Sequence, residues 1–171
     1  MSDKSIKRML RVDQAGEYGA VRIYAGQMAV MGARGPHAQQ IMAMAAQEVE
    51  HRRDFSALLV ARGGRPTLMQ PFWHIAGFAL GAATALISPE AAMACTAAVE
   101  TEIDNHYGRQ LDELGDSDPE LSTLIANARA DEVEHRDIAF ANGAERAPAW
   151  PLLSGAIRLG CRIAIGLSER I

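Results

Sequence analysis

The stretch Glu48-Val49-Glu50-His51-Arg52 recurs unchanged in the second half of the chain as Glu132-Val133-Glu134-His135-Arg136. In each copy a glutamate stands three residues before a histidine, and two such positions on a helix are neighbours, with Cβ atoms roughly 5–6 Å apart. One carboxylate and one imidazole can therefore bind the same metal ion. A single Glu-x-x-His is a weak signal, because charged residues at helical spacing usually form a solvated face, but two copies with the same internal sequence indicate a paired motif.

The composition of the chain favours packed helices. Its 171 residues suit one domain, and a hydrophobic content of 49% is enough for a sizeable core. Aromatic residues make up only 5% of the chain, whereas Ala, Met and Leu are plentiful. We expect an all-α fold, a single four-helix bundle with additional apolar or amphipathic helices. Its core helices are expected at about residues 4–32, 37–62, 89–114 and 118–142, and its accessory segments at residues 71–87 and 152–171.

The repeat extends beyond the shared motif. Three residues of the first half recur in the second at one constant offset, Glu17, Tyr24 and Gln27 matching Glu100, Tyr107 and Gln110. The Glu-x-x-His motifs recur at an offset that is longer by a single position. Such agreement indicates the internal duplication of a helix pair.

Six acidic or imidazole side chains fall at steps of three and four among apolar residues, and are therefore expected to point into the bundle. They are Glu17, Glu48, His51, Glu100, Glu132 and His135. Unpaired buried carboxylates cost several kcal/mol each, and no Lys or Arg shares these registers. Two divalent metal ions would balance four carboxylates, with the imidazoles as neutral ligands. We therefore predict a dinuclear site.

One Glu from each of two helices and a Glu-x-x-His from each of two others form the ligand set of ferritin-like di-iron and di-manganese bundles. In that arrangement Glu17 and Glu100 are terminal ligands and Glu48 and Glu132 bridge the metals. His51 and His135 bind one metal each. The competing interpretation is a set of solvated charged faces with incidental histidines, which leaves the six coincident registers unexplained.

Tyr24 and Tyr107 each lie seven residues after an expected terminal ligand, on the same helix face. They are either core tyrosines or substrate-binding residues that line the active pocket. His37 and His74 lie outside the repeat and are not expected to bind metal.

The segments at 71–87 and 152–171 are more apolar than a soluble bundle needs. The longest apolar run, from Ile75 to Ile87, is shorter than the roughly 18 residues that indicate a membrane-spanning helix. Both segments are expected either to lie on a membrane surface, with Arg158 and Arg162 facing anionic lipid, or to be buried within the fold or an oligomer interface.

The charge and the cysteine content indicate which partners and which cellular location to expect. The net charge is −4 and no long basic run is present, so nucleic acid is not expected as a partner. Cys95 and Cys161 form no Cys-x-x-Cys and indicate buried reduced thiols. The opening segment, Met1 to Arg11, is polar and lacks the apolar core of a secretory signal, which favours a cytosol-facing protein.

The stretch Arg11-Val12-Asp13-Gln14-Ala15-Gly16-Glu17-Tyr18-Gly19-Ala20 closely resembles the opening of the demethoxyubiquinone hydroxylase family. Further family motifs follow in order over nearly the whole chain: Gln47-Glu48-x-x-His51, Arg65-Pro66-Thr67, Ala94–Glu100, His106-Tyr107 and Asp131-Glu132-x-x-His135. Position 14 departs from the pattern, with Gln where many relatives have His.

The resemblance implies a carboxylate-bridged di-iron monooxygenase that uses O2 to hydroxylate the ring of a polyprenylated methoxy-benzoquinol in ubiquinone biosynthesis. It places two iron ions on the six residues named above, in preference to manganese, and implicates His106 and Tyr107 in electron or proton delivery during catalysis. It also suggests a bacterial-type protein, peripheral on the cytoplasmic face of the inner membrane. Further partners left open are a second copy of the chain and an accessory protein of the same pathway.

Two other functions fit the metal motif. A ferritin-like iron store or a peroxide-scavenging di-metal protein would use the same ligands but needs no apolar channel. A quinone-binding accessory protein with a structural metal site would bind the substrate without hydroxylating it.

Overall fold

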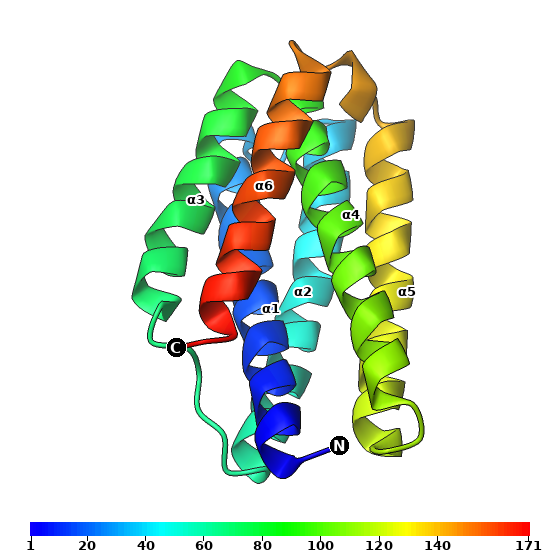
Figure 1. The fold of residues 1–171 in the computed structure, drawn as a ribbon. Coiled ribbons are helices and arrows are strands. Elements are labelled where there is room, and N and C mark those ends of the chain that lie inside the picture. The colour runs from blue at the N-terminus through cyan, green and yellow to red at the C-terminus, as the bar shows by residue number, and fades with distance from the viewer.

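The computed structural model describes all 171 residues and contains only helices (Figure 1). The predicted all-α bundle is confirmed. Its elements are α1 (Asp3–Met31), α2 (Pro36–Ala61), α3 (Gln70–Ile87), α4 (Pro89–Leu114), α5 (Pro119–Ala141), the short 3₁₀ helix η1 (Ala144–Arg146) and α6 (Trp150–Ser168).

Local sequence explains where the helices begin and end. α1 ends at Gly32, which adopts a positive φ of 69°. The Ser88 hydroxyl accepts a hydrogen bond from the Ala91 amide and so caps α4, and the Asp118 carboxylate caps α5 in the same way. A proline follows each of these two caps at the first helical position.

The helices form three layers of two (Figure 1). The middle layer is α1 beside α4, with α2 and α5 packed on one side and α3 and α6 on the other. In each half of the chain the third helix packs against the first, α3 on α1 and α6 on α4. The predicted duplication of a helix pair therefore extends in space to a three-helix unit.

Glycines allow α3 to approach α1 closely. A Cβ atom on Gly81 would run into the carbonyl oxygen of Ile23, and one on Gly26 would meet the α3 backbone at Phe78. Side chains larger than hydrogen at these positions would separate the two helices.

Two large apolar clusters and a smaller third one form the core. One large cluster contains Tyr24, Ile41 and Met44, and the other contains Leu10, Phe55 and Tyr107 among its members. Several buried acidic side chains, which include Glu48 at 0% exposure, belong to none of these clusters.

The outer faces of α3 and α6 are exposed rather than buried. Ile75 and Leu86 on α3 are 70% and 74% exposed, and Leu152 on α6 is 78% exposed. The alternative that both segments are buried within the fold is therefore wrong. No helix has the combination of length and hydropathy that would let it cross a membrane.

Candidate metal centre

The bundle brings the six predicted ligands together between the middle layer, α1 and α4, and the layer formed by α2 and α5. α1 supplies Glu17, α4 supplies Glu100, and each motif supplies its Glu and His from α2 or α5. Ligand atoms lie within 4.8 Å of one another in two groups, Glu17, Glu48, His51 and Glu132 in one and Glu48, Glu100, Glu132 and His135 in the other. Glu48 and Glu132 belong to both groups, the positions expected of bridging carboxylates.

The two shared carboxylates each direct one oxygen toward each histidine. Glu48 Oε1 is 3.1 Å from His135 Nδ1, and its Oε2 is 3.9 Å from His51 Nδ1. Glu132 Oε1 is 3.2 Å from His51 Nδ1, and its Oε2 is 3.3 Å from His135 Nδ1. Glu17 Oε2 lies 3.6 Å from His51 Nδ1 and completes the first group. Each shared carboxylate can therefore contact two ions at once.

The remaining ring nitrogen of each histidine is held by the opposite half of the chain. His51 Nε2 lies 2.9 Å from Asp131 Oδ2, and His135 Nε2 lies 2.8 Å from Gln47 Oε1. Each Nε2 faces an oxygen that can accept its hydrogen, which leaves Nδ1 as the nitrogen available to a metal ion. Our sequence reasoning missed this role of Asp131 and Gln47, although each directly precedes a motif glutamate.

Two tyrosines support the terminal carboxylates across the repeat. The Tyr24 hydroxyl donates to Glu100 Oε1 at 3.0 Å, and the Tyr107 hydroxyl donates to Glu17 Oε1. Burial raises the pKa of both tyrosines well above the usual 10, and the neighbouring glutamates raise it further. Both hydroxyls therefore stay protonated and act as donors.

The two histidines alone do not neutralise the negative charge of the buried glutamates in this cluster. Burial raises the pKa of Glu48 and Glu100 well above 4.5, and the charge of Glu132 adds to the effect. Burial would also raise the pKa of Glu132, but the adjacent His135 and His51 imidazoles outweigh it and lower that pKa to about 2. Burial would lower the pKa of His51, but its interactions with Glu132 and Glu17 outweigh it and raise that pKa to about 11. The pocket thus favours added positive charge.

The residues present fit a metal pair. Buried polar atoms without a hydrogen-bond partner are costly and rare in proteins. Here they concentrate at this point and include Glu17 Oε2, both Oε atoms of Glu48 and of Glu132, and Nδ1 of His51 and His135. Five carboxylate oxygens and two imidazole nitrogens directed at one space match the mixed oxygen and nitrogen ligands of iron or manganese.

An apolar cavity of about 510 Å³ lies on the other side of α1 and α4, beneath α3 and α6. His106 and Tyr107 line it together with Asp13, while most of the wall is small or aliphatic. Tyr107 thus contacts both the cavity and Glu17, a candidate metal ligand. The Tyr107 side chain therefore lies between the cavity and the metal cluster.

The two predicted substrate-facing tyrosines occupy different environments. Tyr107 lines the cavity, but Tyr24 does not; its hydroxyl is directed to Glu100, with Met44 nearby. The expectation that Tyr24 binds substrate stays a prediction, and in the structure its hydroxyl supports a carboxylate. Asp13, which sequence reasoning placed only within a helix stripe, lies in the cavity wall one turn before Glu17.

Several surrounding side chains also differ from expectation. Arg158 Nε donates to Glu102 Oε1 at 2.6 Å and Arg162 donates to the same oxygen at 3.2 Å, so both arginines pair with α4 rather than standing free toward lipid. Both cysteines are free thiols; Cys95 is buried as expected, but Cys161 is only partly buried and lines the cavity.

Comparison with known proteins agrees with these features. The model of a family described as ubiquinone biosynthesis protein COQ7 matches residues 4–168. A Rhodospirillum rubrum protein named 3-demethoxyubiquinol 3-hydroxylase is 55% identical over 166 residues, which cover 97% of this chain and 78% of that protein. The Homo sapiens protein named NADPH-dependent 3-demethoxyubiquinone 3-hydroxylase, mitochondrial, is 49% identical over 175 residues, covering 100% of this chain and 80% of that protein. The Saccharomyces cerevisiae 5-demethoxyubiquinone hydroxylase, mitochondrial, is 42% identical over 182 residues, covering 97% and 78%.

Proposed function

The chain belongs to the ubiquinone biosynthesis protein COQ7 family, and on that premise we propose that it is an O2-dependent hydroxylase of a polyprenylated methoxy-benzoquinol. The observation that carries the proposal is the position of Tyr107. Its ring lines the apolar cavity while its hydroxyl donates to Glu17 in the metal cluster. A ring bound in the cavity would therefore lie close to the cluster.

Two iron ions are the cofactors we assign to the cluster. Glu17 with His51 would hold one ion and Glu100 with His135 the other, and Glu48 and Glu132 would bridge them. When bound, the iron pair supplies the electrons for O2 activation, so that one oxygen atom enters the ring C–H bond and the other leaves as water, with two electrons and two protons from a reductant. Iron is assigned over manganese from the family's hydroxylase chemistry.

The protein's own side chains bind and orient the ring. The small and aliphatic wall, with Gly16, Gly19 and Ala20 on α1, gives a flat apolar surface for the quinol and excludes water around it. At the inner end, Tyr107 keeps its proton and donates a hydrogen bond to Glu17. His106, which also lines the cavity and contacts Asp13, is the second residue we assign to electron or proton delivery.

The hydroxylation assay tests the proposed function directly. Iron-loaded protein incubated with a short-tailed demethoxyubiquinol analogue, O2 and reductant should yield the ring-hydroxylated product, detected by mass spectrometry with one atom from ¹⁸O2. Glu132→Gln should lower the product yield by at least about 100-fold, because a shared ligand is lost. Binding of the analogue without any product in the wild type would support the accessory-protein alternative instead.

An iron store or peroxide scavenger is the other alternative function. Neither needs an apolar cavity beside the metal cluster, whereas a quinol with an isoprenoid tail does. Peroxide consumption that is fast and unaffected by quinol, with no hydroxylated product, would favour it.

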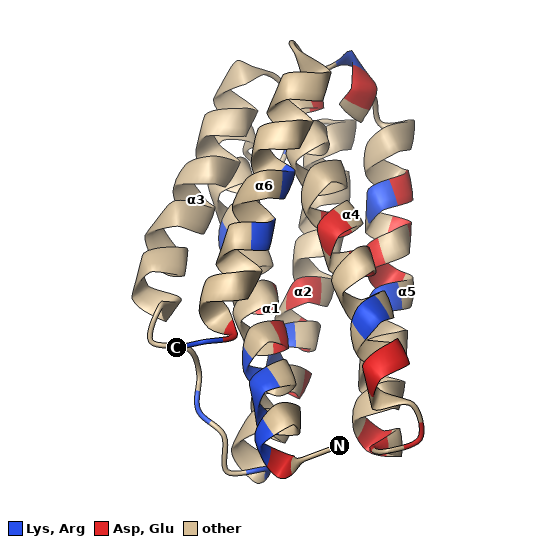
Figure 2. Cartoon of the chain, in the orientation of Figure 1, with Lys and Arg blue, Asp and Glu red and all other residues tan.

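A membrane surface is the setting we propose, on the cytoplasmic face of a bacterial-type inner membrane, because a polyprenyl tail stays in the bilayer. Figure 2 shows α3 free of charged residues along its length. Large apolar side chains project from both outer helices, among them Phe72 and Ile75 on α3 and Leu159 and Ile163 on α6, all more than half exposed. Such a surface is expected to insert into the interfacial region of a bilayer.

Flotation with liposomes tests this attachment. Ile75→Glu should shift the protein from the floating to the soluble fraction, because burying one such side chain contributes about 1.5–3 kcal/mol. Val60→Glu is the matched control: Val60 is 69% exposed but lies on α2, on the opposite side of the bundle. Wild-type protein that stays wholly soluble at low and high salt would contradict attachment.

A further inference from the structure

Asp13 is a buried acid in the wall of the apolar cavity. It lies on α1 with only 1% of its surface exposed. Its Oδ1 accepts hydrogen bonds from Gln110 Nε2 at 2.8 Å and from His106 Nε2 at 3.3 Å, both on α4. Its other oxygen, Oδ2, has no partner. Two donors therefore hold the carboxylate in place and leave one acceptor free.

Two other polar side chains of the cavity wall already have hydrogen-bond partners. Trp73 Nε1 donates to Ser168 Oγ at 3.2 Å, and the Tyr107 hydroxyl donates to Glu17. Asp13 Oδ2 is the one buried side-chain oxygen or nitrogen in this wall that lacks a hydrogen-bond partner. A buried acceptor in apolar surroundings is costly until a donor reaches it, so the wall is suited to a ligand that brings an O–H group.

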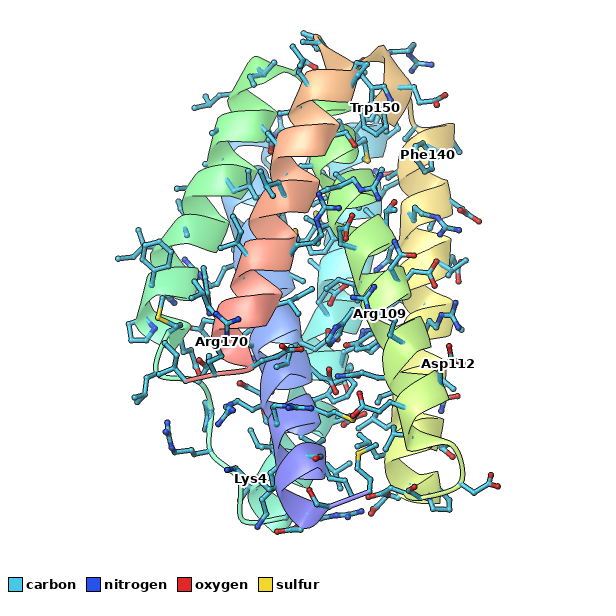
Figure 3. The ribbon with its side chains drawn as sticks, viewed as in Figure 1. Lys4, Arg109, Asp112, Phe140, Trp150 and Arg170 are labelled. Atoms are coloured by element: carbon cyan, nitrogen blue, oxygen red, sulfur yellow. The ribbon has the colours of Figure 1, made fainter.

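The network behind Asp13 leads toward solvent. His106 lines the cavity and also a separate polar pocket of about 150 Å³, formed with Arg8, Arg109 and Glu113. Figure 3 shows Arg109 on α4, and Glu169, which directly follows α6, lines the same polar pocket. The Asp13 carboxylate is thus connected through one imidazole to a polar, charged pocket, and Asp13 itself also lines the apolar cavity.

We propose that Asp13 is the specificity-determining residue for the redox form of the substrate, accepting a hydrogen bond from a ring hydroxyl so that the cavity selects the hydroquinone over the quinone. A hydroquinone presents two O–H donors, whereas a quinone presents only carbonyl acceptors, which would face a carboxylate oxygen with no proton between them. The relatives are named for either form, and the free acceptor favours the quinol. This inference rests on the proposed function, because it takes the quinol ring as the ligand of this cavity.

Direct binding to metal-free protein under anaerobic conditions tests the proposal without turnover. The probes are a short-tailed methoxy-benzohydroquinone and its oxidised quinone, and the measurement is Kd by calorimetry. Wild type should bind the hydroquinone at least about 10-fold more tightly than the quinone. In Asp13→Asn, the amide oxygen still accepts from Gln110 and His106 while the NH2 group is a donor to the cavity, so the preference should disappear or reverse.

Two further variants make the result specific. Thr96→Val is the matched control, because Thr96 is the buried counterpart of Asp13 in the second half of the repeat and does not line the cavity. It should leave the preference unchanged. Asp13→Ala serves if the Asn variant does not fold; it should weaken hydroquinone binding about 10-fold or more and leave quinone binding within about twofold.

The outcomes separate this inference from the proposed function. A wild type that binds both probes equally, that binds neither, or whose preference survives in Asp13→Asn and Asp13→Ala, overturns the role of Asp13. Hydroxylated product from such a protein would leave the proposed function standing. Selective hydroquinone binding with no product formation would support Asp13 and reject the hydroxylase.

Discussion

Glu48 and Glu50 are two residues apart in the same motif and have opposite environments. Glu48 is fully buried and within reach of both histidines, whereas Glu50 is exposed and pairs with Arg53. Their side chains leave the helix about 200° apart, so a helix with one face in the core must separate them. The identical motif in the second half separates Glu132 from Glu134 in the same way.

The number of bound metal ions should depend on Glu48 but not on Glu50. Loaded wild type is expected to hold about two metal ions per chain. Glu48→Gln removes a charge shared by both positions, so we expect fewer than about 0.5 ions per chain by elemental analysis after dialysis. Glu50→Gln changes the same residue type on the exposed face and should retain the wild-type content. Full metal content in Glu48→Gln would contradict the ligand assignment.

Stability of the metal-free protein should fall as pH rises. Burial raises the pKa of Glu48 and Glu100 above their unfolded value of 4.5, so the folded state binds more protons and loses stability as these groups ionise. His51 acts in the same direction: burial would lower its pKa, but pairing with Glu132 and Glu17 raises it from 6.5 to about 11, and the stabilisation present below 6.5 is lost toward 11. Glu132, with its pKa lowered to about 2, has already contributed fully above 4.5.

Urea unfolding with a chelator present measures this dependence. The free energy of unfolding should decrease by more than about 1 kcal/mol between about pH 5.5 and about pH 8. Bound metal favours ionised carboxylates, so the loaded protein should show a smaller decrease or none. A chelated protein that is more stable at about pH 8 than at about pH 5.5 would contradict the raised pKa values.

The sequence was informative about single residues where a helical register decided the outcome. Six inward positions could be predicted because a period of 3.6 residues places them on one face. The partners of these residues could not, because Asp131 meets His51 and Tyr107 meets Glu17 only through packing between halves of the chain. Asp13 was visible only as a polar member of an apolar stripe.

Among the helices, local sequence determines where a helix starts, whereas contacts between distant parts of the chain determine how its charged side chains pair. The starts of α4 and α5 follow from the Ser-Pro and Asp-Pro caps and were predictable. The pairing of Arg158 and Arg162 was not, because their partner, Glu102, lies 56 and 60 residues earlier on α4. A basic amphipathic pattern is the same for a lipid-facing helix and for one that pairs with a buried acid. At the other end of α6, Trp150 packs edge-on against Phe140 of α5 at 5.9 Å, which anchors the helix start (Figure 3).

The crossing of α1 and α3 should depend on the absence of a Cβ atom. Gly81→Ala would place that atom against the Ile23 carbonyl, and overpacking of this kind typically costs about 1–3 kcal/mol. Gly155→Ala is the control on α6, where the new methyl group meets nothing within 4 Å and replacing a helical glycine should stabilise by roughly 0.5–1 kcal/mol. Thermal melting should therefore show a lower Tm for Gly81→Ala and a slightly higher one for Gly155→Ala. Equal shifts would mean that α3 does not pack as closely as described.

Across the whole molecule, the duplication is symmetric at the metal cluster and asymmetric at the cavity. Each half donates a tyrosine to the other half's terminal glutamate, and each histidine is held by the residue before the opposite motif. The cavity, in contrast, is lined by Tyr107 but not by Tyr24. Its polar residues Asp13 and His106 are also not repeated, since Thr96 and Ile23 stand at the corresponding positions. A duplicated sequence predicted the symmetry, but it could not predict which of the two tyrosines lines the cavity.

Paired tyrosine substitutions should separate these two properties. Tyr24→Phe and Tyr107→Phe each remove one hydrogen bond to a terminal carboxylate, so both should weaken metal affinity to a similar extent, about 10-fold in a competition titration. Only Tyr107 lines the cavity, so removing its ring in Tyr107→Ala should weaken binding of the hydroquinone probe to metal-free protein by several-fold, while Tyr24→Ala stays within about twofold of wild type. Equal effects of both substitutions on quinol binding would mean that the substrate approaches the cluster from both halves. In that case the cavity beneath α3 and α6 would not be the single route to the metals.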